Sequence, residues 1–589
     1  MEIDFLTTKS LNGNLWRFSK TDERLVELIV QKYNLPFFIS KILADRKVPI
    51  DEIPHFLNPK IQNLMPDPYC MKDMEKAANK IAQAIINKQK IAIIGDYDVD
   101  GATSSSVLRL FLENVGNIPM IHIPDREEGY GPSKKAIDDF LSQGAELLIT
   151  TDCGTTAFEV FDYAKEKDLP VIVLDHHEAE TKLPDVEALV NPKRLDESDE
   201  NPYLKYMAAV GVVFMTVVAV NRVLRNKDFY KKDIKEPDLR NLLDIVALGT
   251  VCDVVPLLGL NRAFVRSGLE MFAKKQNIGI NALIEKSAIK DEISSYHLGY
   301  VLGPRINAGG RVGDSSLGNK LLCCKDMKQA QQIAEELDVC NAQRKEIENY
   351  VLLQAMEILE GTPQEYPMAF VYGNDWHQGV VGIVAGKLKE RYNLPSFVMS
   401  IESDEVKGSA RSISGLDIGA LIMSAKEKGI LTKGGGHIMA AGFSLNEDRI
   451  DDFRKFAGEY ISKNLKDESL TPIIDIEGTI DVSAVNVDIV KHIESLEPFG
   501  AGNNEPKIMI ANALLSKVDV VGAGHIRCMF TSINGGYLKA MAFRATDNEM
   551  GKALLNGQGQ CFNLVGVLRN NTWQNTTTPQ FIIDDAMRM

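Results

Sequence analysis

The sequence predicts an α/β protein in which a parallel-sheet domain is joined by a long helix to a second α/β domain, followed by a C-terminal β-barrel. Three observations predict this class. Short apolar runs alternate with helical periodicity from about residue 71. A helical pattern without Gly or Pro runs from residue 327 to 359. Strand-like runs separated by Gly- and Asn-rich turns follow residue 471.

The parallel-sheet domain is expected over residues 71–326, after an irregular, partly helical N-terminal segment (1–70) that is interrupted by prolines. Strands that alternate with helices form a parallel sheet covered on both faces. In such sheets, functional side chains gather at the carboxyl ends of the strands. The predicted strands are 90–94, 118–123, 147–150 and 171–174, and the predicted helices are 71–88, 102–115, 134–142 and 157–167.

The later regions are expected as a connecting helix (327–360), a second α/β domain (361–466) and a β domain (467–589). In the β domain, short strands separated by turns are typical of a small barrel or sandwich. Strands of the second α/β domain are predicted at 368–371 and 396–400, and those of the β domain at 473–476, 507–510, 517–521, 527–530, 538–542 and 561–568.

Composition limits the class of protein. The formal charge of -15 argues against a protein that coats nucleic acid by charge alone, but it leaves room for a local basic track. Eight cysteines without a C-x-x-C pair disfavour a disulfide framework or a zinc ribbon, and favour a reducing cytoplasm. The longest apolar run, 208–220, is shorter than the roughly 18 residues of a membrane span and predicts a buried helix. Glu2 and Asp4 come before any Lys, and the N-terminal region has no apolar segment of the signal-peptide type, so a secretory signal is not expected.

An acidic loop follows the first predicted strand. It places Asp96, Asp98 and Asp100 within five positions. Carboxylates this close repel one another unless a positive charge lies among them. A bound cation would provide that charge; the alternative is a solvated acidic turn, which is common for isolated clusters.

Other chemistry-bearing residues follow the later strands. Asp152 comes directly after the third strand, and Asp175-His176-His177 after the fourth, while Asp253 follows an apolar helix. A lone His pair is more often structural than metal-binding. Because strand ends of a parallel sheet lie side by side, these residues are expected to converge with the acidic loop and to hold a metal.

Carboxylates with one or two imidazoles suit Mn²⁺ or Mg²⁺ better than a thiolate-binding metal. Two such ions roughly 3.5–4 Å apart can clamp the attacking and leaving oxygens of a displacement at phosphorus. A carboxylate must bridge the two ions, and Asp152 is the candidate. The sequence therefore predicts a phosphodiesterase with two divalent ions.

These motifs resemble the DHH phosphoesterase superfamily. Asp175-His176-His177 matches the motif that names it, and Lys433-Gly434-Gly435-Gly436-His437 resembles the glycine-rich loop of its second, DHHA1-like domain. Further runs are similar to the RecJ family of single-strand-specific 5′→3′ exonucleases. They are 129–131, 303–308, 376–386, 408–412 and 498–503. One departure is Ala308-Gly309-Gly310-Arg311, where that family commonly has Ala-Ala-Gly-Arg.

The resemblance implies roles for residues of the parallel-sheet domain. His177 would contact the scissile phosphate or stabilise charge there, and His177 and Asp152 are the implied catalytic residues. Asp96 would be a metal ligand or a neighbour of one. The implied metal ligands are Asp98, Asp100, Asp152, His176 and Asp253.

The resemblance also implies contacts to the DNA strand. Ser409 and Arg411 would hold the 5′-phosphate, with Arg126 and Arg305 as further candidates. An Arg can donate two hydrogen bonds to a phosphate, whereas an exposed surface Arg is the default alternative. The last domain resembles an OB-fold, which either tracks the strand or acts as a structural clamp.

Other residues of the second α/β domain are candidate substrate contacts. The backbone N–H groups of Gly434, Gly435 and Gly436, with His437, could approach a phosphate, although a glycine triplet can also be a plain turn. Trp376 and His377 would stack on a base or pack beneath the site.

The expected function is degradation of single-stranded DNA to 5′-mononucleotides with two Mn²⁺ or Mg²⁺ ions, in DNA repair and recombination. Expected partners are single-stranded DNA, a helicase and a single-strand-binding protein, and the chain is expected to be a cytoplasmic monomer. A first rival is a DHH enzyme that acts on short oligoribonucleotides or cyclic dinucleotides. A second is a non-catalytic scaffold that binds DNA or replication proteins.

Overall fold

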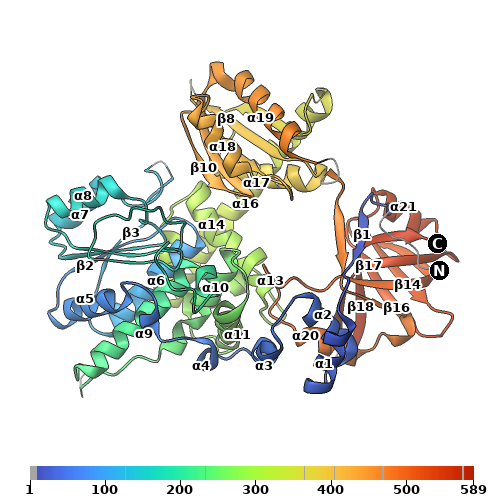
Figure 1. Ribbon diagram of the computed structural model, residues 1–589, viewed down its shortest axis with the longest axis horizontal. Coiled ribbons are helices and arrows are strands. Elements are labelled where there is room, and N and C mark those ends of the chain that lie inside the picture. Colours follow the sequence, from blue (N-terminus) through green and yellow to red (C-terminus); the bar gives the residue numbers. More distant parts are fainter. Residues whose placement is uncertain are drawn as a thin grey trace. The chain divides into compact units, whose positions relative to one another are not determined.

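In the computed structural model, the chain folds into two compact units (Figure 1). The first unit comprises residues 1–50, 345–495 and 505–589, and the second comprises 51–344 and 496–504. The structure describes residues 9–126, 128–231, 234–363, 365–402, 405–466, 470–573 and 576–589.

The second unit is built on a five-stranded sheet in the order β3-β2-β4-β5-β6, with every neighbouring pair parallel. Its central strands are continuous apolar runs because a parallel sheet is buried on both faces; all four residues of Ile91–Ile94, for example, are buried. The strands are β2 (Ile91–Ile94), β3 (Met120–His122), β4 (Leu147–Thr151), β5 (Val171–Leu174) and β6 (Ala188–Val190).

Helices cover both faces of this sheet (Figure 1). Helices α5, α6 and α9 share one hydrophobic core with the strands, and α7 and α8 enclose a second core on the other face. The predicted doubly covered parallel sheet is confirmed. These helices are α5 (Met74–Ile86), α6 (Val99–Asn114), α7 (Lys134–Ser142), α8 (Phe158–Glu166) and α9 (Ala209–Asn226).

Helix α9 is long and apolar enough to cross a membrane by length and composition, but 78% of it is buried inside the protein, as expected of a core helix. The rest of the second unit is mainly helical. Its helices are α3 (Ile53–Leu57), α4 (Ile61–Leu64), α10 (Leu243–Cys252), α11 (Gly259–Phe272), α12 (Ile278–Lys286), α13 (Ser295–His297), the π-helical turn η5 (Leu298–Leu302), α14 (Gly303–Val312) and α15 (Leu317–Leu322).

A short loop from late in the chain, residues 496–504, completes the second unit. The buried Arg262 of α11 donates hydrogen bonds to the carbonyl oxygens of Leu496, Glu497 and Pro498. Leu257 donates its backbone N–H to Ala501. These contacts fix the loop against α11.

The long helix α16 (Met327–Gly361) runs from the second unit into the first. There it leads to a five-stranded sheet in the order β10-β11-β9-β8-β7, in which only β7 and β8 are parallel. The elements are β7 (Ala369–Asn374), α17 (Gln378–Tyr392), β8 (Ser396–Glu402), β9 (Glu405–Arg411), α18 (Ile418–Glu427), β10 (Lys433–His437), β11 (Ala440–Asn446) and α19 (Ile450–Asn464).

The C-terminal strands close into a barrel. They run in the order β14-β15-β16-β18-β17, and β17 pairs back onto β14, which confirms the predicted β-barrel. Strand β1 of the N-terminal segment pairs with β12, in parallel, within this unit. The remaining elements are β1 (Leu15–Phe18), α1 (Glu23–Tyr33), α2 (Phe37–Asp45), β12 (Ile473–Ile476), β13 (Gly478–Ile480), α20 (Val487–Glu494), β14 (Ile508–Val521), β15 (His525–Thr531), β16 (Tyr537–Ala542), α21 (Glu549–Leu555), β17 (Cys561–Trp573) and β18 (Thr576–Arg588).

Candidate metal centre

The acidic loop connects β2 to α6. Asp98 caps the helix by accepting a hydrogen bond from the backbone N–H of Gly101 at 3.1 Å. Asp100 lies in the first turn and accepts from the backbone N–H groups of Ala209 and Val210 at 2.6 and 3.0 Å. Position 101 requires glycine because a Cβ there would lie 2.4 Å from the carbonyl oxygen of Asp96. The loop therefore holds its three acids in a tight turn in which Asp96 and Asp100 are buried and Asp98 is half-buried.

Asp152 follows β4 directly and is buried. Its backbone is left-handed, with φ of +61°, a conformation that is uncommon for residues with a Cβ. Its Oδ1 has no hydrogen-bond partner among the described residues. The backbone thus presents a bare carboxylate oxygen at the edge of the sheet.

Asp175 positions other residues. It accepts hydrogen bonds from the backbone N–H and the hydroxyl of Thr155 at 2.9 and 2.6 Å, and lies 2.8 Å from Nδ1 of His177. Although burial opposes ionisation, the hydrogen bond from His177 keeps the pKa of Asp175 below its usual value. The same carboxylate keeps the pKa of His177 above its usual value against the effect of burial. Asp175 therefore orients His177.

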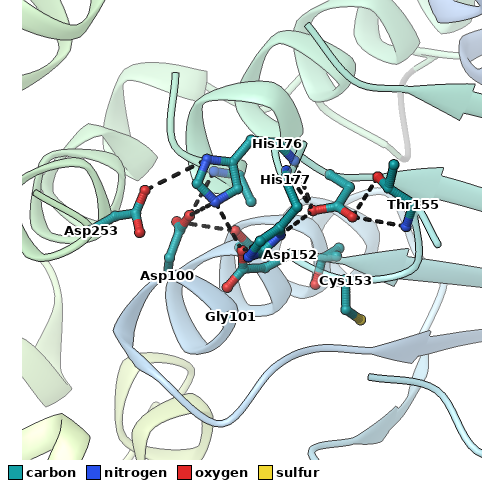
Figure 2. A network of polar contacts seen from close by, with 12 residues as sticks. Asp100, Gly101, Asp152, Cys153, Thr155, His176, His177 and Asp253 are labelled. Carbon is teal, nitrogen blue, oxygen red and sulfur yellow. Dashed lines mark hydrogen bonds and ion pairs between the residues drawn. The ribbon is translucent and has the colours of Figure 1, made fainter. Parts of the chain in front are cut away.

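His176 lies at the centre of the group (Figure 2). Its Nδ1 is 3.0 Å from the carbonyl oxygen of Met207, and its Nε2 is 3.4 Å from Oδ1 of Asp152 and 3.8 Å from Oδ2 of Asp100. Oδ2 of Asp253, at the C-terminal end of α10, is 3.6 Å from Nδ1. Because a carbonyl oxygen accepts from Nδ1, the proton of the neutral ring lies on Nδ1. Nε2 then has a free lone pair that faces the carboxylates. Burial, with the neighbouring His177, lowers the pKa of His176 to about 3, so the ring is neutral.

The carboxylates carry strongly perturbed pKa values. Burial and the charge of Asp98 raise the pKa of Asp96 to about 8 and that of Asp100 to about 7. Burial and neighbouring carboxylates raise the pKa values of Asp152 and Asp253 well above the usual range. Such a cluster is unfavourable as it stands, because buried like charges repel and are poorly solvated.

The residues fit a divalent cation. Oδ1 of Asp96, Oδ1 of Asp152 and Oδ2 of Asp253 are buried and have no hydrogen-bond donor among the described residues. Hard divalent cations prefer oxygen ligands of this kind. Three sets of ligand atoms lie within 4.8 Å of one another: Asp96, Asp98 and Asp152; Asp100, His176 and Asp253; and Asp152, His176 and His177.

Arginines lie beside the acidic loop. Arg126 stacks its guanidinium 4.2 Å from the ring centre of Tyr97 and donates to the carbonyl oxygen of Gly310 at 2.7 Å. Burial and the charge of Arg126 lower the pKa of Arg311 to about 10. Arg305, in contrast, donates to Oδ1 of Asp338 at 2.8 Å and to the carbonyl oxygen of Val301. Of the two further arginine candidates for contact with the strand, Arg126 lies beside the metal group and Arg305 is paired with an acid.

Sequence reasoning did not select three residues that the structure places at this edge. They are Arg311, Tyr130 and Asn307. The hydroxyl of Tyr130 lies 3.1 Å from Nδ1 of His177 and donates to the carbonyl oxygen of Asp152. Oδ1 of Asn307 accepts a hydrogen bond from the backbone N–H of Val99. All three lie within or beside motif runs that carried the family resemblance. That proximity was the available signal, since nothing in their spacing shows that they reach the acidic loop.

Ser409 and Arg411 lie together on β9 in the other unit. Nη1 of Arg411 donates to Oγ of Ser409 and to the carbonyl oxygen of Ala410, both at 2.9 Å. A Cβ at Gly382 would lie 3.0 Å from Nη2 of Arg411 and 3.1 Å from Oγ of Ser409, so glycine leaves room over both. Burial lowers the pKa of Arg411, and none of these contacts is a carboxylate. The pair is therefore a half-buried cation beside uncharged partners.

The glycine-rich loop forms β10, which pairs with β11. Gly436, with φ of +159°, sits where a Cβ would be 2.4 Å from the carbonyl oxygen of Ala440, and this close approach requires glycine. Gly434 faces Ile422, whereas a Cβ at Gly435 would meet nothing within 4 Å. His437 is exposed at the end of the strand.

Trp376 and His377 have packing and capping contacts. The Trp376 ring is 3% exposed and donates its Nε1–H to Oε1 of Gln354 at 2.8 Å. Nδ1 of His377 accepts from Gly379 N–H at the start of α17. This placement favours packing of Trp376 over stacking on a base.

Three family models match the chain. They are the DHH family N-terminal domain over residues 90–250, the DHHA1 domain over 365–463 and the RecJ OB domain over 476–585. A parallel sheet with an edge of acids and imidazoles, followed by these two modules, defines a DHH-family protein of the DHH–DHHA1–OB type.

Relatives narrow this class. The chain is 33% identical over 577 residues to the single-stranded-DNA-specific exonuclease RecJ of Bacillus subtilis, covering 97% of this chain and 70% of the relative. It is 35% identical over 481 residues to the Escherichia coli protein of the same name, covering 80% of this chain and 82% of the relative. The chain belongs to the RecJ family.

Solved structures share the fold. The Thermus thermophilus RecJ crystallised with Mn²⁺ matches with a TM-score of 0.81 and 24% identity, over 98% of this chain and 79% of that one. A RecJ exonuclease bound to manganese matches with a TM-score of 0.56 and 29% identity, over 68% of this chain and 96% of that one.

Proposed function

We propose that this protein is a metal-dependent exonuclease that hydrolyses single-stranded DNA from the 5′ end to 5′-mononucleotides, in DNA repair and recombination. The observation that carries the proposal is the group of buried carboxylates and one imidazole at the carboxyl edge of the parallel sheet. Its relatives carry the name single-stranded-DNA-specific exonuclease and span most of the chain.

The residues that would hold two Mn²⁺ or Mg²⁺ ions are Asp98, Asp100, Asp152, His176 and Asp253, with Asp96 as a ligand or close neighbour. Asp152 is the candidate bridge because it belongs to two of the three sets of ligand atoms. When bound, the ions supply Lewis-acid polarisation of the phosphodiester and neutralise charge that develops during displacement at phosphorus.

His177 would contact the scissile phosphate. Its side chain is 39% exposed, and its hydrogen bond to Asp175 orients the ring. A ring oriented in this way can donate to a non-bridging phosphate oxygen without losing the order that Asp175 imposes. Arg126, beside the acidic loop, would contribute a second cation near the strand.

Arg411 and Ser409 would receive the 5′-phosphate of the strand. Arginine can donate two parallel hydrogen bonds to a phosphate, and the hydroxyl of Ser409 adds another donor. The contacts of Arg411 to Ser409 and Ala410 are uncharged, so an incoming phosphate would be its counter-ion. The N–H groups of residues 434–436, with His437, are further candidates.

The experiment compares three substrates with Mn²⁺ present: a 5′-overhang, a blunt duplex and a dinucleotide. The proposal expects release of mononucleotides from the overhang, starting at its 5′ end, and little release from the blunt duplex. Equal degradation of overhang and blunt duplex would refute single-strand specificity. Turnover of dinucleotides alone would favour the oligoribonucleotide or cyclic-dinucleotide rival, and DNA binding without turnover would favour the scaffold.

Partners and location also belong to the proposal. A helicase would supply single strands, a single-strand-binding protein would hold them, and a monomer would suffice for the reaction. All eight cysteines are free in the structure, in keeping with a reducing cytoplasm. Pull-down with purified partners and sedimentation of the chain would test these points.

A further inference from the structure

Two tyrosines form a stacked, exposed pair on the second unit. Tyr296 lies on α13 and Tyr300 on the π-helical turn η5, four residues apart. Their ring centres are 5.2 Å apart with an angle of 27° between the planes, and the residues are 57% and 74% exposed. Residues four apart on a helical segment lie on one face, so both rings face solvent together.

The segment beneath the rings is firmly held. Leu298 and Leu302 are completely buried in the main core of the unit. The hydroxyl of Ser295 donates to the carbonyl oxygen of Phe499 at 2.6 Å. Ser294 and His297 form a capping box at the start of α13. The two rings are therefore a preorganised aromatic surface on a rigid support.

The same segment packs against the helix that ends in a candidate metal ligand. Sγ of Cys252 donates to the carbonyl oxygen of Leu298 at 3.4 Å, and a Cβ at Gly303 would lie 2.4 Å from that sulfur. Asp253 is the residue after Cys252. At the other end of the segment begins α14, whose Asn307 accepts from Val99 N–H in the acidic loop. The tyrosine pair is thus built onto the elements that frame the metal centre.

We propose that Tyr296 and Tyr300 form a stacking platform for bases of the single strand beyond the nucleotide being cleaved. This rests on the proposed function. Every base offers a π-face, so aromatic stacking holds a strand without reading its sequence, which suits an enzyme that must move along any DNA. The rings already adopt a near-parallel arrangement like that of stacked bases, and the elements that carry them pack against elements of the site that would hold the reacting phosphate. The occupant is therefore DNA, rather than an aliphatic protein surface.

The first test measures kcat/KM of the Tyr296→Ala/Tyr300→Ala double variant on a 20-nucleotide single strand and on a dinucleotide, both 5′-phosphorylated. Loss of one or two stacked bases lowers the value for the 20-mer about 10-fold or more. The dinucleotide value stays at that of the wild type, because a dinucleotide does not extend past the metal centre. Ile118→Ala is the matched control: it removes an apolar side chain that is 83% exposed and lies just before the edge strand β3.

The outcomes separate the platform from the proposed function. A wild-type protein that degrades neither substrate contradicts the function itself. If the wild type is active and the double variant is unaffected, the platform is overturned, and contact with a protein partner becomes the better explanation of the exposed rings. An equal loss on both substrates also overturns it, because the rings would then support the metal centre alone.

A second test distinguishes stacking from apolar bulk and reports binding directly. Tyr296→Phe/Tyr300→Phe keeps both rings, whereas Tyr296→Leu/Tyr300→Leu keeps only volume. Each is combined with Asp152→Ala to prevent cleavage, and each binds oligonucleotides that carry 2-aminopurine at successive positions. We expect quenching at one or two adjacent positions with the Phe variant and none there with the Leu variant. Identical quenching profiles would overturn the platform.

Discussion

The acidic edge of the parallel sheet and the Arg411 site of the mixed sheet bury charge in opposite ways. At the first, several carboxylates surround one neutral imidazole, and three of their oxygens have no donor among the described residues. At the second, one guanidinium is half-buried against a hydroxyl and a carbonyl. Charge that is removed from water without a counter-charge is costly, which supports the proposal that the first site binds cations and the second an anion.

The largest effect is expected at the first site. Asp152→Asn removes the carboxylate shared by two sets of ligand atoms and should lower kcat on the order of 10³-fold, because Lewis-acid stabilisation contributes several kcal/mol. Single-turnover rates on a 20-nucleotide single strand measure it. Glu166→Gln, an exposed acid at the end of α8, is the control. Near-wild-type turnover by Asp152→Asn would contradict the proposal that the acidic edge holds the catalytic metal ions.

An isolated buried carboxylate sharpens the comparison. Burial raises the pKa of Asp244, on α10, to about 6. For an acid, a raised folded-state pKa means that ionisation destabilises the fold above that pKa, and that the penalty disappears below the unfolded value near 4. Asp244→Asn should therefore be more stable than the wild type at pH 8, by on the order of 3 kcal/mol, and equal to it near pH 3.5.

Urea unfolding at the two pH values, with chelator present in both, measures this difference. An Asp244→Asn variant that is less stable at pH 8 would mean that this carboxylate has an ionic partner, as the clustered acids would have in bound metal.

Metal binding at the acidic edge should raise the free energy of unfolding by an amount similar to the effect of Asp244→Asn at pH 8. A ligand present at 100 times its Kd adds about 2.7 kcal/mol to the free energy of unfolding. Thermal unfolding with Mn²⁺ should therefore occur at a higher temperature than with chelator at equal ionic strength. The Asp152→Asn protein should show a smaller increase, and an equal increase in both proteins would place the bound metal elsewhere.

The smallest effect is expected at the cationic site. Arg411→Ala should lower kcat/KM for a 5′-phosphorylated strand by roughly 10- to 100-fold, since hydrogen bonds to charged groups contribute about 1.5–3 kcal/mol. A strand with a 5′-hydroxyl should be affected less. The ratio of the two kcat/KM values is the measurement, and Arg391→Ala on α17 is the exposed control. An equal loss on both strands would show that Arg411 does not hold the 5′-phosphate.

Much of the metal-centre unit followed from the sequence because its strands are buried on both faces and end in polar residues. The predicted strand 171–174 has the observed bounds of β5, and the predicted convergence of Asp152, His176 and Asp253 at one edge is present. The hydrophobic periodicity and the expected order of the strands were enough to predict that these side chains meet. The barrel strands were harder to delimit: runs 507–510 and 517–521 are one strand, β14, with shifts in its pairing register.

Local pattern could not reveal contacts made across the fold. The positions of Arg311 and Tyr130 depend on how α14 and the 129–131 turn pack against the sheet. The burial of Trp376 depends on Gly373, where a Cβ would lie 2.3 Å from the indole, so the sequence alone left stacking and packing equally open. The pairing of β1 with β12 joins segments more than 450 residues apart, from Leu15 to Ile473, and has no short-range signal.

The loop at residues 496–504 has a consequence for dissecting this molecule. It belongs to the metal-centre unit although the segments on both sides of it belong to the other unit. A fragment that ends at Arg344 would leave the guanidinium of Arg262 buried without three of its carbonyl acceptors. The gene therefore cannot be cut at one point into two self-sufficient halves, and a minimal catalytic fragment would need this peptide supplied in trans or grafted back through a linker.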